Sequence, residues 1–276
     1  MRLLVVGCGD LGGRVARLAV DGGHEVFGAR RTAGRVPDGV DPLVLDVTDP
    51  ASVELPDGLD AFVYSVAASE RTDDAYRAAY PEGLRAIIGA LPEPARVRGL
   101  FISSTAVHGA RDGSWVDEES GSAPTSFSGR RLLEAERVLA GAPLAAASSL
   151  RLGGIYGPGR TSLLRSVEAG AASLAPHVEW TNRIHVEDAA RAVLHVLGLV
   201  PLPPLVEVVD EEPAPRAEVL NFLAARLGRP SPPVEDTPAP RGLGKRVSSA
   251  RLARSGFDWR YPTYREGYAA LIDGAD

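Results

Sequence analysis

The sequence holds few of the residues that stabilise disulfide-linked or metal-bound proteins. Cysteine occurs once, at Cys8, among 276 residues, which excludes an internal disulfide and a Cys-rich zinc site. No cluster of cation ligands with suitable spacing is present, so we expect no catalytic metal. Lysine also occurs once, at Lys245, so the other 29 of the 30 Lys plus Arg residues are arginines. Any chemistry that needs a lysine must use this one residue.

Long apolar segments and strong net charge are absent as well. No stretch approaches the roughly 18 apolar residues of a membrane span, and the chain begins with a strand instead of a signal peptide. We therefore expect a cytoplasmic protein that does not bind a membrane. The net charge is −6 and 45% of the residues are hydrophobic, so nothing favours nucleic acid as a partner. A chain of this length can bury a large core, as one α/β domain or as a domain with a smaller lobe.

The most informative stretch is the first twelve residues, MRLLVVGCGDLG. An apolar run leads into Gly7-Cys8-Gly9-Asp10-Leu11-Gly12, and RVARLAV then has the spacing of a helix packed on a sheet. In a G-x-G-x-x-G turn, Gly7 permits the tight turn, Gly9 lets the backbone approach a pyrophosphate, and Gly12 lets the helix pack close to the strand. The helix N-terminus offers N–H groups to the phosphates. The loop predicts dinucleotide binding, with a structural glycine turn as the alternative.

The next two strands end in charged residues. The second strand, His24 to Arg30, ends in Arg30-Arg31, where an acidic residue would suit the ribose 2′-hydroxyl and arginine suits a 2′-phosphate. We therefore predict NADP(H), with NAD(H) as the alternative if both arginines are merely solvated. A short third strand, Leu43 to Leu45, runs into Asp46-Val47-Thr48-Asp49. Asp46 either accepts from the adenine amino group or shares helix capping with Thr48 and Asp49.

The fourth and fifth strands end in small and hydroxyl-bearing residues. The fourth, Asp60 to Ala68, ends in SVAA, as a backbone lying under a cofactor requires. A helix is expected from Asp73 to about Ala90. The fifth, Gly99 to Gly109, carries Ser103, Ser104 and Thr105 at its carboxyl end, where open α/β sheets place their ligands. These hydroxyls either hold a substrate oxygen or cap the following loop.

The alternation of strands and helices predicts a Rossmann-type, doubly wound parallel sheet. We assign residues 1–155 to an NAD(P)-binding domain. Residues 156–276 are mostly a small C-terminal substrate lobe, with residues 177–210 returning to the sheet. Residues 183–197 are expected to form a helix, residues 228–244 an exposed proline-rich connection, and residues 261–272 end in an amphipathic helix.

Taken together, these motifs resemble the extended short-chain dehydrogenase/reductase superfamily, specifically its NAD-dependent epimerase/dehydratase group. The motifs that carry the resemblance are the glycine loop, DVTD at 46–49, SSTAVHG at 103–109, LRLGGIYGPGR at 150–160 and RIHVEDAARA at 183–192. The resemblance implies a nicotinamide cofactor and a small-molecule substrate, with Tyr156 of the YGPG loop beside the nicotinamide. It implies helix-start roles in capping and positioning for His185 and Asp188. It also allows a homodimer, because related folds often dimerise through the helices after the fourth and fifth strands.

Two departures from the family pattern stand out. The glycine loop is one residue shorter than the usual G-x-x-G-x-x-G. The catalytic Tyr-x-x-x-Lys is missing, since Phe127 or Ser128 takes the tyrosine position and Arg131 or Leu132 the lysine position. The only lysine lies far outside that helix, so the usual proton relay cannot exist. Arg131 keeps a positive charge that could bind ribose or phosphate.

The same pattern resembles the atypical, YeeZ-like lineage of the family, which lacks the relay. The segments that carry this likeness are Ser128-Gly129-Arg130, Gly244-Lys245-Arg246 and Tyr261 to Gly267. The reactions of that lineage are, as far as the resemblance carries, undefined.

Two functions follow as hypotheses. The first is an oxidoreductase or epimerase acting on a carbonyl or sugar-nucleotide-like substrate, with Ser104, His108 and Ser128 as candidate catalytic residues. Ser104 would orient a substrate oxygen, and His108, which stands where the family has tyrosine, titrates near neutral pH when unperturbed; a structural role for His108 is the alternative. The second is a non-catalytic NADP(H)-sensing protein. The predicted cofactor-binding residues are Gly7, Gly9, Asp10, Leu11, Gly12, Arg30, Arg31, Asp46, Val47, Ala67, Arg131 and Tyr156.

Overall fold

The computed structural model describes residues 1–32, 34, 36–235 and 242–274. The chain divides into two compact units. The first comprises Met1–His108, Ser122–Arg151 and Ala190–Val206, and the second comprises Gly109–Gly121, Leu152–Ala189 and Glu207–Asp276. Of the expected proline-rich connection over 228–244, residues 236–241 lie outside the described residues. Within the described ranges, no helix has the length and apolar composition needed to cross a membrane.

A seven-stranded sheet runs in the order β11-β7-β5-β4-β1-β2-β3. The pairs β1–β2, β1–β4, β2–β3 and β4–β5 are parallel, with Val6 opposite both Ala29 and Tyr64. The order reverses between β1 and β4, which is the point where such sheets bind ligands. This confirms the predicted doubly wound sheet. The strands are β1 (Arg2–Val6), β2 (Glu25–Arg30), β3 (Val40–Val44), β4 (Ala61–Tyr64), β5 (Arg98–Ser104), β7 (Ala146–Leu152) and β11 (Leu205–Val208).

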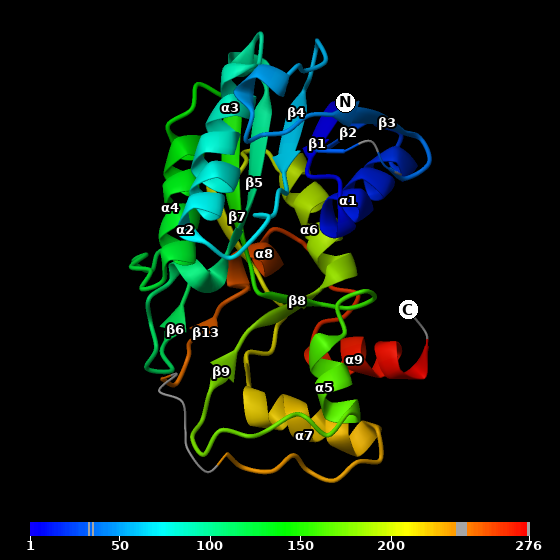
Figure 1. Ribbon diagram of the computed structural model, residues 1–276, viewed down its shortest axis with the longest axis vertical. Coiled ribbons are helices and arrows are strands. Elements are labelled where there is room, and N and C mark those ends of the chain that lie inside the picture. Colours follow the sequence, from blue (N-terminus) through cyan, green and yellow to red (C-terminus); the bar gives the residue numbers. More distant parts are fainter. Residues whose placement is uncertain (33, 35, 236–241, 275–276) are drawn as a thin grey trace. The chain divides into compact units, whose positions relative to one another are not determined.

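Helices cover the sheet on both sides. α1 (Asp10–Asp21) packs against β1 and β2, and its buried residues Leu11, Val15 and Ala19 recur at helical spacing. α4 (Phe127–Ala140) packs on β5 and contacts both α2 (Asp73–Arg77) and α3 (Gly83–Gly89). Figure 1 shows α2, α3 and α4 together on one side of the sheet and α1 on the other. Short 3₁₀ turns complete this part: η1 (Pro50–Ser52), η3 (Pro94–Arg96) and η4 (Thr105–Val107).

The helix expected from Asp73 to about Ala90 is interrupted in its middle. A π turn, η2 (Ala78–Glu82), separates α2 from α3 and contains Pro81. Proline has no N–H to give, so the hydrogen-bond pattern widens locally. The buried hydroxyl of Tyr64 donates to the carbonyl oxygen of Ala79 at 2.5 Å, which fixes the widened turn to β4. The core of this unit surrounds Tyr64 and Phe101.

The second unit contains short strand pairs and four helices of its own among the described residues. β8 pairs with β10 and β6 with β13 in parallel, while β9 pairs with β12 antiparallel. Its apolar core joins α5, α7 and α9. The elements are β6 (Trp115–Val116), β8 (Gly154–Tyr156), α5 (Ser162–Glu168), β9 (Trp180–Thr181), β10 (Arg183–His185), β12 (Ala214–Pro215), α7 (Arg216–Arg226), β13 (Arg246–Val247), α8 (Ala250–Arg254) and α9 (Tyr264–Asp273).

One expected helix begins later than its sequence pattern indicated. Residues 183–185 form β10, and α6 (Val186–Gly198) starts only after them. The reason is pairing with β8, in which Arg183 lies opposite Gly154 and His185 opposite Tyr156. A non-local partner therefore overrides the local helical spacing at these three positions.

Candidate functional site

Three glycines shape the loop between β1 and α1, each for a different reason. Gly7 has a φ of +87°, and a Cβ there would lie 2.6 Å from the carbonyl oxygen of Ser65. A Cβ on Gly12 would collide with the carbonyl oxygen of Gly7. At Gly9, in contrast, the nearest atom to a Cβ would be 4.0 Å away, so the loop surface is open there. These are the features that a pyrophosphate-binding turn requires.

The first turn of α1 continues this open surface. Asp10 is exposed and Leu11 is buried beneath it. Gly9 is the N-cap residue, and among the described residues no side chain caps the helix. α4 and α9, in contrast, are capped by the hydroxyls of Ser126 and Thr263. A helix start without a side-chain cap suits an anionic ligand, because N-terminal N–H groups need acceptors.

The charged residues after β2 and β3 lie in different surroundings. Arg30, the last residue of β2, is half-buried, and Arg31 is exposed. The Asp46 carboxylate accepts from the Thr48 amide at 2.9 Å and from the Thr48 hydroxyl at 2.7 Å. These bonds lower the pKa of Asp46, and the charge of Arg31 lowers it further. Asp46 thus closes a local turn with Thr48, whereas Asp49 caps η1 by accepting from the Ala51 amide at 3.2 Å. The contact of Asp46 with adenine stays a prediction.

Other residues near the loop differ in exposure. Val47 belongs to the core with 5% exposure, whereas Ala67, just after β4, is exposed. Cys8 is buried, and a Cβ on the neighbouring Gly28 of β2 would lie 2.9 Å from its sulfur. Burial raises the pKa of the Cys8 thiol. Cys8 therefore fills the turn as an inert side chain.

The carboxyl end of β5 presents two serines with different tasks. Ser103 is buried and its hydroxyl donates to Glu136 at 2.6 Å. Ser104 is half-buried and accepts a bond from the Ala106 amide at 3.2 Å, which caps η4. Because Ser104 only accepts in this bond, its O–H proton remains available for a substrate oxygen.

The start of α4 lies directly against this strand end. A Cβ on Gly129 would be 2.6 Å from the carbonyl oxygen of Ala106, so only glycine allows this approach. Ser126 caps the helix by accepting from the Gly129 amide at 3.1 Å, and its hydroxyl lies 3.0 Å from that of Ser128. The Ser-Gly-Arg motif thus brings hydroxyl groups close to η4.

Two stripes of α4 separate the alternative positions of the missing relay. Ser128, Leu132 and Glu136 follow one another at intervals of four, and the last two are buried toward the sheet. Phe127 instead packs edge-on against Tyr76 of α2, with ring centroids 5.4 Å apart. Ser128 and Leu132 therefore share one stripe of α4, whereas Phe127 and Arg131, the alternative pair, lie on the stripe that faces α2.

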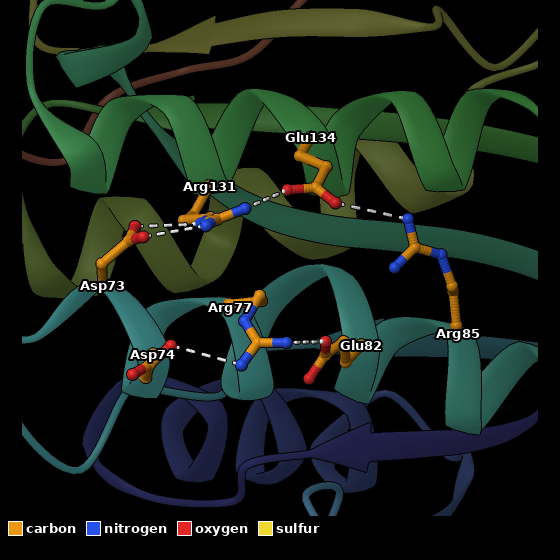
Figure 2. A network of polar contacts seen from close by, with 7 residues as sticks. All are labelled: Asp73, Asp74, Arg77, Glu82, Arg85, Arg131 and Glu134. Atoms are coloured by element: carbon orange, nitrogen blue, oxygen red, sulfur yellow. Dashed lines mark hydrogen bonds and ion pairs between the residues drawn. The ribbon is translucent and has the colours of Figure 1, made fainter.

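Arg131 lies on the stripe of α4 that faces α2. Its Nε and Nη2 donate to Asp73 at 2.9 and 2.8 Å, and its Nη1 donates to Glu134 at 3.0 Å. Figure 2 shows Glu134 reaching Arg85 in turn, so that these charges form one chain across the helices. Arg131 is thus paired with two carboxylates, and its contact with a cofactor stays a prediction.

His108 is buried beside a guanidinium. Its Nε2 lies 3.4 Å from Nη1 of Arg151, whose Nη2 also donates to Ser122 at 2.8 Å. Because a guanidinium only donates, Nε2 accepts in a neutral ring, and the ring proton then sits on Nδ1. The catalytic role of His108 stays a prediction.

The buried partner of Arg151 was not anticipated. The Glu136 carboxylate accepts hydrogen bonds from Nε and Nη2 of Arg151, at 2.9 and 2.7 Å. The sequence does hold a signal, because Glu136 falls four residues after Leu132 and three before Leu139, on the buried phase of the helix. An acidic residue on an apolar phase indicates a buried partner.

Five tyrosines among the described residues do not have the property that a substitute for the missing relay needs. A tyrosine that gives a proton near neutral pH needs a lowered pKa. Burial raises the pKa of Tyr268 to about 12 and raises the pKa of four others: Tyr64, Tyr80, Tyr156 and Tyr264. Burial lowers the pKa of Lys245, against the charge of Glu207.

Tyr156, predicted beside the nicotinamide, is packed in the second unit. It is 3% exposed, stacks on Tyr268 at 4.4 Å between ring centroids and meets the edge of His185 at 5.2 Å. A Cβ on Gly267 would collide with its hydroxyl. Its contact with a cofactor stays a prediction.

The start of α6 holds the segment before α9. The Asp188 carboxylate accepts from the amides of Arg260 and Tyr261 at 2.9 and 2.7 Å. The ring of His185 lies 4.0 Å from that of Tyr261. These two residues position the YPTYREG segment in this unit. Across the described ranges, no three His, Cys, Asp or Glu side chains gather as metal ligands would.

The chain is similar to two named proteins, although no protein-family model matches it. It is 28% identical to protein YeeZ of Escherichia coli K12 over 271 residues, covering 95% of this chain and 96% of YeeZ. It is 29% identical over 303 aligned positions to the 3-diazoavenalumate denitrifying reductase of a Streptomyces species, covering 97% and 99%.

A solved structure gives a stronger likeness. The chain is 37% identical to a structure assigned as an NAD-dependent epimerase/dehydratase of Methylobacillus flagellatus, with a TM-score of 0.82, covering 99% of this chain and 98% of that one. This chain belongs to the NAD-dependent epimerase/dehydratase family. The likeness to YeeZ confirms the predicted atypical lineage.

Two more distant solved structures share the fold. Human epimerase family protein SDR39U1 with NADPH is 20% identical, with a TM-score of 0.81 and 99% coverage of both chains. UDP-glucuronic acid 4-epimerase of Bacillus cereus, with UDP-glucuronic acid and NAD, is 15% identical, with a TM-score of 0.79 and coverage of 99% of this chain and 98% of that one. At these identities the likeness shows the Rossmann-type fold alone.

Proposed function

We propose that this chain is an NADP(H)-dependent oxidoreductase or epimerase acting on a carbonyl compound or a sugar-nucleotide-like small molecule. The observation that carries the proposal is the glycine loop, which is open at Gly9 and leads into a helix without a side-chain cap. Two structures of the same fold hold NADPH and NAD, which supports a nicotinamide cofactor. NAD is the alternative cofactor.

Different residues of the first unit suit different groups of such a cofactor. When bound, the cofactor supplies or accepts a hydride at its nicotinamide ring. Backbone amides of the glycine loop would hold the pyrophosphate, and Arg30 at the end of β2, with Arg31 directly after it, would hold the 2′-phosphate. The set within this unit is Gly7, Gly9, Asp10, Leu11 and Gly12 at the pyrophosphate, Arg30 and Arg31 at the 2′-phosphate, Asp46 and Val47 at the adenine, and Ala67 and Arg131 toward the nicotinamide. Tyr156 belongs to the second unit, and its contact with the nicotinamide stays a prediction.

On the substrate side, the hydroxyl groups at β5 and α4 orient the reacting oxygen. The O–H group of Ser104 donates a hydrogen bond to that oxygen. Ser128 is one of the two residues, with Phe127, that fall at the position of the family's tyrosine. A serine hydroxyl orients well but is too weak an acid to replace tyrosine without a base beside it. His108 is the third candidate, and an imidazole is a side chain that can act as a general acid or base.

Binding measurements test the cofactor assignment. The purified protein is titrated with NADPH, NADH, 2′,5′-ADP and 5′-AMP, and Arg30→Ala and Arg31→Ala are compared with Arg17→Ala, an exposed arginine of α1. We expect Arg30→Ala to weaken NADPH and 2′,5′-ADP by about tenfold or more, equivalent to about 1.4 kcal/mol, and to leave NADH nearly unchanged. Equal losses for both dinucleotides would contradict the 2′-phosphate assignment.

The second candidate function is a non-catalytic NADP(H) sensor. The raised tyrosine pKa values and the absence of Tyr-x-x-x-Lys favour it. Turnover of a panel of carbonyl and sugar-nucleotide substrates separates the two functions, and Ser104→Ala should lower turnover without changing cofactor affinity. NADPH binding without turnover of any substrate would favour the sensor.

The proposal extends to organisation and location. We assign cofactor binding to residues 1–155 and substrate binding mostly to residues 156–276, in a cytoplasmic protein that forms a homodimer. The buried single cysteine, which needs no oxidising compartment, supports the location. Sedimentation velocity tests the homodimer directly, and fractionation of cells that produce the protein tests the location.

A further inference from the structure

The loop that would hold the pyrophosphate carries a negative charge of its own. Asp10 is the first residue of α1, and its side chain is 40% exposed. In the free protein a carboxylate in the first turn is favourable, because it faces the positive end of the helix dipole. For a bound pyrophosphate, the same carboxylate is a like charge in the same turn. Asp10 therefore stabilises the free helix and opposes the ligand.

A neighbouring arginine offsets this charge. Arg14 lies one helical turn further along α1, and its Nε is 3.3 Å from Oδ1 of Asp10. Arginine stays protonated at all relevant pH values, so the Asp10–Arg14 pair carries no net charge toward the ligand. The Arg14 side chain is 26% exposed, so water and salt screen the pair only in part.

We propose that Arg14 is a positioning residue of the cofactor site: by neutralising Asp10, it lets a carboxylate-bearing glycine loop accept a pyrophosphate. This inference rests on the proposed function of that loop. With Arg14 removed, Asp10 repels the phosphates. With Asp10 removed, the loop has no carboxylate to neutralise and Arg14 matters much less. The two residues are therefore coupled in binding.

The chain supplies a matched control on the same helix. Arg17 and Asp21 form a second pair four residues apart, with Nε 3.8 Å from Oδ2, and both side chains are more than 60% exposed. This pair lies in the last turns of α1, away from the glycine loop. Arg17→Gln removes an equivalent charge from α1 without removing the partner of Asp10.

A double-mutant cycle tests the coupling by fluorescence titration with NADPH and NADH. The variants are Arg14→Gln, Asp10→Asn, the double variant and Arg17→Gln. We expect Arg14→Gln to raise the Kd for both dinucleotides about tenfold, and Asp10→Asn to lower it about threefold. In the Asp10→Asn background, Arg14→Gln should change the Kd by less than about threefold. Arg17→Gln should leave the Kd within about twofold of the parent.

A second readout does not involve the ligand. Asp10→Asn should lower the thermal midpoint of the free protein, because the first turn of α1 loses a stabilising carboxylate. The same substitution should tighten the binding of the dinucleotide. If Asp10 had only a structural role, Asp10→Asn would lower both the stability of the protein and its affinity for the dinucleotide. An unchanged Kd in Arg14→Gln overturns the inference alone, as does an equal loss in both backgrounds. If the unmodified protein binds neither dinucleotide, the proposed function and the inference both fall.

Discussion

The carboxylate of Glu136 accepts hydrogen bonds from Nε and Nη2 of the Arg151 guanidinium, at 2.9 and 2.7 Å. The Glu136 side chain is 9% exposed and the Arg151 side chain 3%. Ser103 donates to the same carboxylate at 2.6 Å. α4 and the strand end that carries Ser104 are thereby connected through one buried ion pair. The pair positions the candidate substrate serine without touching it.

Breaking that pair should cost far more stability than breaking an exposed one on the same helix. We expect Glu136→Gln to lower the free energy of unfolding by about 3–5 kcal/mol, because it leaves the Arg151 charge buried and uncompensated. The control is Glu134→Gln, whose pair with Arg131 is 37% and 27% exposed and should change stability by less than about 1 kcal/mol. Urea denaturation of both variants gives the ranking, and equal losses would contradict it.

The buried Asp210 should make stability fall as pH rises. Burial raises the pKa of Asp210 well above its ordinary 3.8, against the opposing charge of Arg183 and with support from Glu212 and Glu266. For an acid with a raised folded pKa, the unfolded chain ionises first, so the folded state loses stability as pH rises above the ordinary value.

Asp210→Asn removes that penalty. We expect the variant to be more stable than the parent by more than about 1 kcal/mol near neutral pH, the usual cost of burying a polar group without full compensation. The difference should widen as pH rises above about 4, the ordinary pKa of an aspartate. Asp188→Asn is the control, since its carboxylate accepts two backbone amides and its loss should destabilise. A difference that does not grow with pH argues against a raised pKa.

Gly267 should not tolerate a side chain. A Cβ there would collide with the Tyr156 hydroxyl and ring, so Gly267→Ala should cost about 1–3 kcal/mol. Adding Tyr156→Phe removes the nearest atom and should recover part of the loss. Gly89→Ala, where a Cβ would meet nothing within 4 Å, should be neutral or stabilising by up to about 1 kcal/mol. Thermal melts of the three variants measure the order of their stabilities.

Cys8 should react slowly while the protein is folded. It is 2% exposed, and burial raises the pKa of its thiol, so little thiolate is present near neutral pH. We expect alkylation by iodoacetamide to be about a hundredfold slower in buffer than in urea. Mass spectrometry follows the single site, and equal rates would show that the turn opens readily.

The parts of the fold that sequence predicts well are those whose contacts are local. The three glycines of the loop lie within six residues, and local geometry accounts for two of them: Gly7 turns the chain with a positive φ, and Gly12 lies against the Gly7 carbonyl oxygen. Residues 183–185 look helical locally but pair with β8. Arg131 meets Asp73, 58 residues away, and no local pattern specifies that choice.

The residues of the candidate site also divide into those that local sequence specifies and those that depend on distant partners. Ser104 follows from its strand end and Glu136 from its helical phase, both of which can be read from sequence. The surroundings of His108 cannot, because Arg151 comes from another strand, 43 residues away. The packing of Tyr156 on Tyr268 likewise depends on a distant helix.

The burial of Leu132 has a consequence for how this lineage can change. It is 7% exposed within the core of the first unit, on the same stripe of α4 as Ser128. Ser128→Tyr would restore a phenol at that position, but Leu132→Lys would put an ammonium group among apolar side chains, which disfavour its charged form. A relay at Ser128 and Leu132 therefore requires repacking of the core as well as two substitutions. A relay at the alternative positions, Phe127 and Arg131, would need two substitutions at residues that are only half-buried.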